Sequence, residues 1–221
     1  MATKQHFFFL ILKKVFNFFK NKSLNNEDIS SVLVLQITKS VLKQQIIFFE
    51  EYIKFSKKML HEYEQKIQDD YQKNSQKDVV EEKDMISDDF YNKEIYKKTS
   101  FEMVIIANYR LCELTLKKLL CTKLKENEIM GLNFHGLKKK FKPMLNLGLI
   151  ENYTDVNELR LLNNCIKHNG KVSRKLSNIT RNKPRHWIQD DEISIDENII
   201  DRMYKASEKF LLDVIEQFSF E

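Results

Sequence analysis

Apolar residues recur every three to four positions over most of the chain, which is the spacing of helices that bury one face. The longest stretch follows the candidate capping residues Asn25, Asn26 and Asp28 and runs to about residue 71. Its apolar positions are Ile29, Val32, Leu33, Ile37, Val41, Phe48, Tyr52, Phe55, Met59, Tyr63 and Ile67. Their spacing is compatible with coiled-coil-like packing, and the polar residues between them are expected to face solvent. A continuous helix of this length would be roughly 60 Å long.

The pattern weakens and then returns twice more. Residues 72–83 are polar and carry charges of both signs, which predicts a linker or a frayed helix end. Helix resumes from about Asp88 and is clear from Ser100, where residues 101–120 are apolar on most sides, as in a central bundle helix. Residues 127–153 form a connection that contains a short helix near 137–141, and Asp196 is expected to cap a final helix.

Glycine and proline are scarce, with 4 and 2 residues in 221, so the chain has few turn formers for a many-stranded fold. We therefore expect an all-α helical bundle with long N-terminal helices. One short β-hairpin could form near the C-terminus, from residues 187–189 and 192–195. The predicted organisation is an N-terminal helix at 1–24, a long helix and charged linker at 25–98, and a helical core at 99–221 that forms one domain with 25–98.

The first 24 residues predict an amphipathic helix. One side carries Phe8, Leu12, Val15, Phe16 and Phe19. The apolar run ends at a pair of lysines, too soon for a membrane span, and no signal-peptide cleavage site follows. Docking on the bundle is the favoured interpretation. A basic helix at a membrane interface and a ligand for a partner protein's groove are the alternatives.

Charge and cysteine content limit the possible ligands and the cellular compartment. The net charge of +5 permits contact with nucleic acid without requiring it. The 3 cysteines are odd in number and show no metal-binding spacing. We therefore expect a cytoplasmic protein with no metal and no cofactor.

Candidate chemistry concentrates on one predicted helix, residues 158–170. Asn164 and His168 lie four positions apart and share a polar face with Asn157, while Arg160 and Lys167 flank that face. A histidine, amides and cations are costly inside a core, so this face needs a cleft, an interface or water. Gly170 is suited to end the helix in a left-handed cap.

This run resembles the signature helix of the HEPN superfamily (higher eukaryotes and prokaryotes nucleotide-binding), in which an arginine precedes a histidine that is often followed by Asn or Gly. Asn164, His168 and the pair Asn169-Gly170 match it. The arginine differs: residues 161–163 occupy the positions that the family allows, and Arg160 lies one residue too far back. Residues 100–218 follow the family's helix order, and Glu113 stands where a glutamate recurs in its preceding helix.

The resemblance implies a homodimer in which two signature helices build one cleft for metal-independent RNA cleavage. His168 would then be the acid/base, Asn164 would position the RNA by hydrogen bonding, and Arg160 or Lys167 would replace the missing cation. Along the helix axis Arg160 is about 12 Å from His168, so it would serve the partner's histidine more easily than its own. Members with degraded motifs look like binding or assembly modules, including partners in defence and toxin–antitoxin systems, so an antitoxin or other protein partner is the second hypothesis. A purely structural bundle is the third.

The segment after the signature helix suits single-stranded RNA. Lys171, Arg174 and Lys175 are followed by further cations and by the only tryptophan, Trp187. Cations attract phosphates and an aromatic ring can stack on a base. The alternative is a polar surface loop that Trp187 anchors by packing inward.

Overall fold

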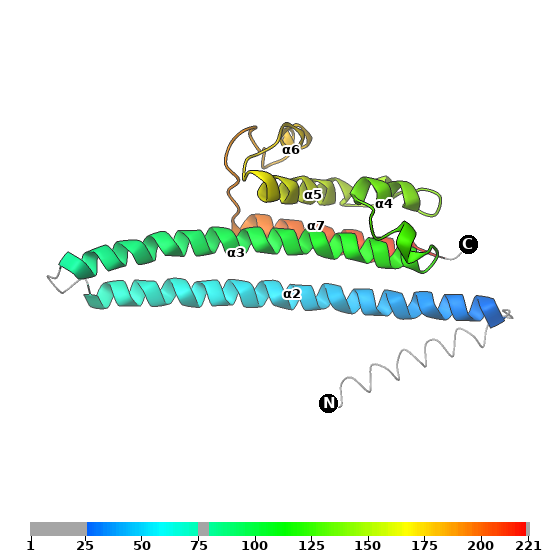
Figure 1. The fold of residues 1–221 in the computed structure, drawn as a ribbon, viewed down its shortest axis with the longest axis horizontal. Coiled ribbons are helices and arrows are strands. Elements are labelled where there is room, and N and C mark those ends of the chain that lie inside the picture. The colour runs from blue at the N-terminus through cyan, green and yellow to red at the C-terminus, as the bar shows by residue number, and fades with distance from the viewer. Residues whose placement is uncertain (1–25, 75–79, 220–221) are drawn as a thin grey trace, which may run out of the picture. The chain divides into compact units, whose positions relative to one another are not determined.

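A computed structural model describes residues 26–74 and 80–219, and those residues form six α-helices and no strand (Figure 1). The helices are α2 (Asn26–Asn74), α3 (Val80–Cys121), α4 (Phe134–Phe141), α5 (Tyr153–His168), α6 (Arg174–Thr180) and α7 (Glu197–Gln217). Two 3₁₀ helices, Glu126–Glu128 and Leu147–Leu149, flank α4. The predicted all-α fold is therefore confirmed, while the amphipathic helix predicted for residues 1–24 lies outside the described residues.

The two long helices extend further than their sequence pattern indicates. Helix α2 continues to Asn74, and α3 begins at Val80, before the expected start near Asp88. Both ends of the stretch 72–83, expected to be a linker, are therefore helical. No glycine or proline occurs between residues 72 and 100, so nothing in the backbone opposes the helix there.

Two of the predicted helix ends are present, whereas Asn26 and Asp28, expected as caps, lie within α2. The Ile199 amide donates a hydrogen bond of 2.8 Å to Oδ1 of Asp196, which caps α7 as expected. Gly170 has a φ of +66° and its amide donates to the Cys165 carbonyl at 2.9 Å, which closes α5 with the predicted left-handed residue. Helix α4 starts at Phe134, earlier than predicted, because Asn133 caps it by accepting from the Gly136 amide.

The hairpin expected from residues 187–195 does not form. Glu192 pairs instead with Lys171 in an isolated antiparallel bridge. The Ile193 amide donates to the Gly170 carbonyl at 2.8 Å. Residues 192 and 193 therefore pair with the segment that follows α5. They do not pair with residues 187–189, as the predicted hairpin requires.

The chain divides into two compact units. The described part of the first unit comprises residues 26–47, 111–153 and 208–219. The Phe141 and Phe218 rings meet edge to face at 5.6 Å in its core. Lys117 is buried and lies 2.6 Å from Glu113 Oε1, and it also donates to the Met130 carbonyl. Glu113 therefore has an intramolecular partner on its own helix.

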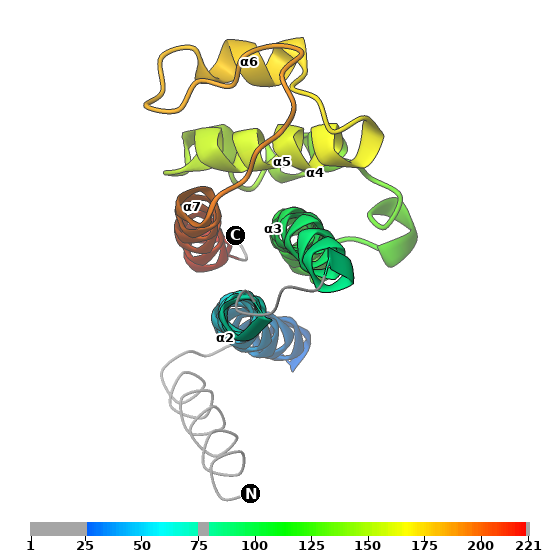
Figure 2. The ribbon, with the colours of Figure 1, turned by 90° about the vertical axis from the view of Figure 1, so that its left-hand side faces the viewer.

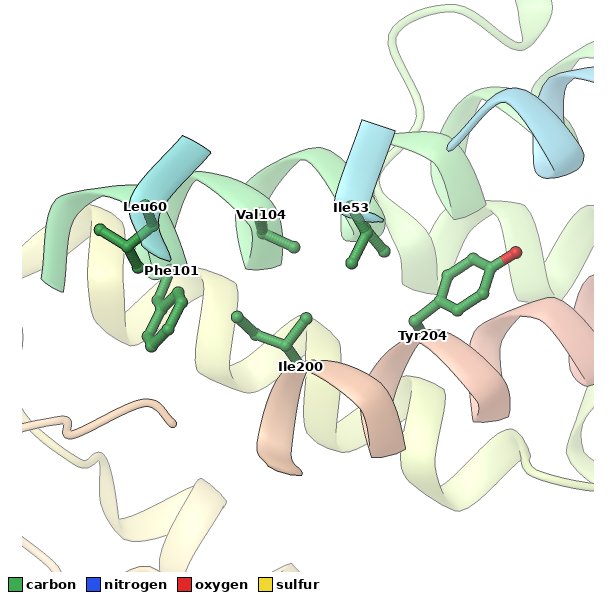
Figure 3. Packing of buried hydrophobic residues seen from close by; sticks show 6 residues of the cluster. All are labelled: Ile53, Leu60, Phe101, Val104, Ile200 and Tyr204. Atoms are coloured by element: carbon green, nitrogen blue, oxygen red, sulfur yellow. The ribbon is translucent and has the colours of Figure 1, made fainter. Parts of the chain in front are cut away.

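The described part of the second unit comprises residues 48–74, 80–110 and 154–207. Its parts of α2 and α3 run antiparallel, and Lys97 on α3 forms an ion pair of 2.9 Å with Glu64 on α2. Within this unit α3 and α7 lie between α2 and α5, and α6 lies beyond α5 (Figure 2). A cluster of apolar side chains joins α2, α3 and α7 (Figure 3): Ile53, Leu60, Phe101, Val104, Ile200 and Tyr204.

Helix α2 carries two apolar stripes, and the structure buries the one that the sequence pattern did not single out, together with Ile67 of the predicted stripe. Its buried apolar residues are Leu35, Leu42, Ile46, Ile53, Leu60 and Ile67. Most of the predicted stripe is exposed instead: Ile37, Val41, Phe48, Tyr52, Phe55 and Met59. Among the described residues, one segment of α2, Ser31–Lys73, is long and apolar enough to cross a membrane, a test that core helices of soluble proteins also pass.

Candidate functional site

The polar face predicted for α5 is open to solvent. His168, Asn164 and Lys167 are all exposed, while Leu159 and Leu162 on the opposite side are fully buried. Within the described residues no hydrogen bond or ion pair engages the His168 ring. An exposed imidazole beside an amide and an ammonium group is placed to contact an anionic ligand from solvent.

Arg160 points to another partner. Its Nε and Nη2 donate hydrogen bonds of 3.1 and 2.9 Å to Oδ1 of Asn157, one turn earlier on α5. These bonds hold the guanidinium toward the beginning of the helix, away from His168 at its end. Within one chain, Arg160 therefore does not lie beside the proposed acid/base.

The three positions at which the HEPN signature would place its arginine are buried. Leu161, Leu162 and Asn163 are all buried, with 6%, 0% and 2% of their surface exposed. The Oδ1 atom of Asn163 is buried without a hydrogen-bond partner. An arginine at any of these three positions would enter the interior of the second unit, so the departure from the signature agrees with the way that α5 packs here.

Exposed cations follow α5, as the sequence indicated. Lys171, Arg174 and Lys175 are exposed, and among the described residues none of their side chains forms an ion pair. The Ser173 side chain accepts from the Leu176 amide at 3.3 Å and starts α6, so Arg174 and Lys175 project from its first turn. These three cations, with Lys167 and His168, form what we call the α5–α6 basic surface.

Trp187 does not belong to that surface. Its residue surface is 4% exposed and its indole Nε1 donates to Glu158 Oε1 at 3.0 Å. The Arg185 guanidinium lies 4.7 Å from the centre of the ring. A ring covered in this way cannot stack on a base, so the expectation that Trp187 contacts RNA is corrected. The structure agrees with the alternative interpretation, a surface loop that Trp187 anchors by packing inward.

A buried charge cluster that the sequence did not indicate surrounds Glu158. The Glu158 carboxylate is fully buried, and Arg202 of α7 donates to it through two nitrogens at 2.6 and 3.1 Å. Lys183 Nζ lies 2.8 Å from Glu158 and 2.7 Å from Asp155. This arrangement joins α5, α7 and the loop after α6 within the second unit.

The cluster keeps Glu158 ionised. Burial alone would raise the pKa of Glu158, but the hydrogen bonds from Arg202, Lys183 and Trp187 outweigh it and hold the pKa below its ordinary value. The same carboxylate raises the pKa of Arg202. Every oxygen of the buried carboxylate thus has a donor, as a buried charge requires.

One signal could have revealed this cluster from the sequence. Glu158 lies four residues before Leu162 and seven before Cys165, so it falls on the face that α5 buries. A carboxylate on a buried face needs a cation, but the sequence does not say which of its many lysines and arginines supplies it. Only the fold brings Arg202, 44 residues later, to that place.

Comparison with protein-family models, with curated proteins and with solved structures found no match to this chain. Within the described residues, no three His, Cys, Asp or Glu side chains come together in a group able to hold a metal ion. The α5–α6 basic surface and the neighbouring Asn164 offer an exposed imidazole, an amide, and cations that form no ion pair with the rest of the described chain.

Proposed function

We propose that this chain is a HEPN-like protein that binds single-stranded RNA on the α5–α6 basic surface and cleaves it without a metal ion. The observation that carries the proposal is the joint exposure of His168 and Asn164 on one face of α5, next to cations that have no ion-pair partner among the described residues. Phosphates would be attracted by Lys171, Arg174 and Lys175, because charge neutralisation supplies much of the affinity for RNA.

The reaction would be an internal transfer of the phosphoryl group. His168 accepts the proton of a ribose 2′-hydroxyl, whose oxygen bonds to the adjacent phosphorus as the bond to the 5′-oxygen breaks. The departing 5′-oxygen takes that proton from the imidazolium, which leaves a cyclic phosphate and a 5′-hydroxyl end and returns His168 to its neutral form. Asn164 would orient the phosphate, and a second chain would supply the cation that residues 161–163 cannot. The proposed active unit is thus a homodimer.

Cleavage is tested with end-labelled single-stranded RNA in the presence of EDTA. We expect cyclic phosphate ends. The cleavage rate of His168→Ala should be lower by at least about 100-fold, because general acid–base catalysis contributes about 10²–10⁴-fold. His61→Ala is the matched control, since His61 is another exposed histidine of the same unit. Intact RNA with the unaltered protein, or equal cleavage by His168→Ala, would reject the nuclease proposal.

RNA binding is tested separately from cleavage. Each of Lys171→Glu and Lys175→Glu should weaken binding for all sequences and lower the dependence of affinity on salt by about one unit of slope. Lys205→Glu, an exposed lysine of α7 in the same unit, should leave both unchanged. If the three variants behave alike, the α5–α6 basic surface is not where RNA binds.

A non-catalytic binding or assembly module, partnered by itself, an antitoxin or another protein, is the second candidate. The burial of residues 161–163 favours it, because the group that would hold the scissile phosphate is absent from its expected place. In this case the exposed face of α5 contacts a partner, and Arg160→Glu would weaken that complex while RNA remains intact. Detection of cyclic phosphate ends that depend on His168 would exclude it.

A further inference from the structure

An apolar groove lies between α2 and α3 in the second unit, with a volume of about 530 Å³. Its walls include Tyr52, Phe55, Met59 and Tyr63 from α2 and Tyr96 and Met103 from α3. The Tyr63 and Tyr96 rings meet edge to face at 5.4 Å across it. We call this feature the α2–α3 groove.

The side chains of this groove are unusually exposed for their type. Phe55 is 61% and Tyr96 58% exposed, and Phe48, one turn before Tyr52 on the same stripe, is 74% exposed. Tyr52, Met59 and Met103 are a further 44%, 49% and 53% exposed. At about 200 Å² for each of these six side chains, the exposed surface amounts to roughly 700 Å², near the ~800 Å² that each partner buries in a standard interface.

The charges beside the groove are of both signs and are already paired. Lys54 lies 2.9 Å from Glu50 and 3.0 Å from Glu51, and Lys58 lies 3.6 Å from Glu62. An anionic membrane or a nucleic acid would be matched by an excess of cations. A border with balanced charges suits an equally balanced surface, and a two-fold interface requires a surface that is complementary to itself.

The spacing of the stripe points to a helical partner. Phe48, Tyr52, Phe55 and Met59 follow each other at intervals of four, three and four residues, the interval of helices that pack side by side. We propose that a second copy of this chain docks on the α2–α3 groove, so that two antiparallel α2–α3 pairs bury each other's exposed aromatic residues. The dimer is then a bundle of four helices.

This contact is distinct from the one implied for the RNA site. Within the second unit, α3 and α7 lie between α2 and α5 (Figure 2). A dimer held by the α2–α3 groove therefore leaves the exposed face of α5 uncovered. The inference does not depend on RNA binding or cleavage.

The test measures the mass of the full chain in solution by sedimentation equilibrium over a range of concentrations. We expect a dimer whose dissociation constant is at least about 30-fold higher in Phe55→Glu and in Tyr96→Glu, because a charge placed in the centre of an apolar interface cannot be solvated. Both side chains are more than half exposed in the monomer, so neither substitution opens a cavity, and circular dichroism should show unchanged helix content.

Leu149→Glu is the matched control. Leu149 is 83% exposed and belongs to the first unit, outside the groove, so its replacement adds the same charge at an exposed apolar position and should leave the dimer intact. As a second measurement, Ser56→Cys places a thiol in the groove, and oxidation should link two chains in the dimer.

Three results would overturn the proposal. The first is a monomer at 100 µM, about the concentration at which weak dimers form. The second is a dimer that survives Phe55→Glu and Tyr96→Glu and dissociates on Arg160→Glu, which would place the contact on α5. The third is a monomer that binds vesicles of phosphatidylcholine and phosphatidylserine through Phe55, which would make the occupant a lipid surface.

Discussion

The charges around Glu158 and the aromatic residues of the α2–α3 groove depart from the usual distribution of residues in opposite directions. In the first region a carboxylate is fully buried, and in the second a phenylalanine is 61% exposed. Buried Glu158 has donors on both oxygens from within its own chain. The groove has no such complement among the described residues. A buried charge must find its hydrogen-bond donors within the same fold, whereas exposed apolar surface can be buried later, when a partner binds.

The largest effect is expected from Glu158→Gln. The substitution removes the negative charge and leaves Arg202 and Lys183 beside a neutral amide, so the free energy of unfolding should fall by about 3 kcal/mol. Urea unfolding followed by circular dichroism measures it. Glu151→Gln is the control, because Glu151 is exposed and its ion pair with Lys209 should contribute less than ~1 kcal/mol. Equal effects would mean that burial of the cluster does not matter.

Acid should act on the same cluster. Because the pKa of Glu158 is lowered on folding, its stabilising contribution is complete above the ordinary carboxyl value near 4.5 and is lost as the pH falls through the lower value of the folded state. The free energy of unfolding of the unaltered protein should therefore decrease with acidification in this range. Glu158→Gln should show a smaller decrease, and parallel curves would contradict the assignment.

Trp187→Phe should have an intermediate effect. It removes one donor to Glu158 and leaves a gap in a buried site, while Arg202 and Lys183 still hold the carboxylate. We expect a loss of about 2 kcal/mol in the free energy of unfolding, measured by the same urea titration. RNA binding should be unchanged, and a loss of RNA affinity without loss of stability would restore Trp187 as a contact residue.

The smallest effect on the isolated chain is expected from Phe55→Ser. At concentrations where the chain is monomeric, replacing a largely exposed ring should change the free energy of unfolding by less than ~0.5 kcal/mol. At high concentration the unaltered protein should unfold at a higher temperature than at low concentration, and Phe55→Ser should not. Thermal unfolding at two concentrations thus separates the groove from the charge cluster.

Local signals predicted much of the fold. The cap at Asp196, the left-handed end at Gly170 and the long apolar repeats all act over a few residues, and each is present. Prediction was less successful for the hairpin and for the start of α3. The hairpin failed because residues 170–172 satisfy the backbone of the loop, and the start of α3 was misplaced because polar residues without glycine or proline continue a helix.

From the sequence alone it follows that the chain is helical, that one helix ends at Gly170 and another begins after Asp196, and that the polar face with His168 and Asn164 needs a cleft, an interface or water. The tertiary structure alone decided which of the two apolar stripes of α2 is buried, that Trp187 points inward, and that Arg202 meets Glu158. The physical reason is that periodicity reports which residues share a face of a helix. Which face is covered depends on the helices that pack against it, and these come from remote parts of the chain.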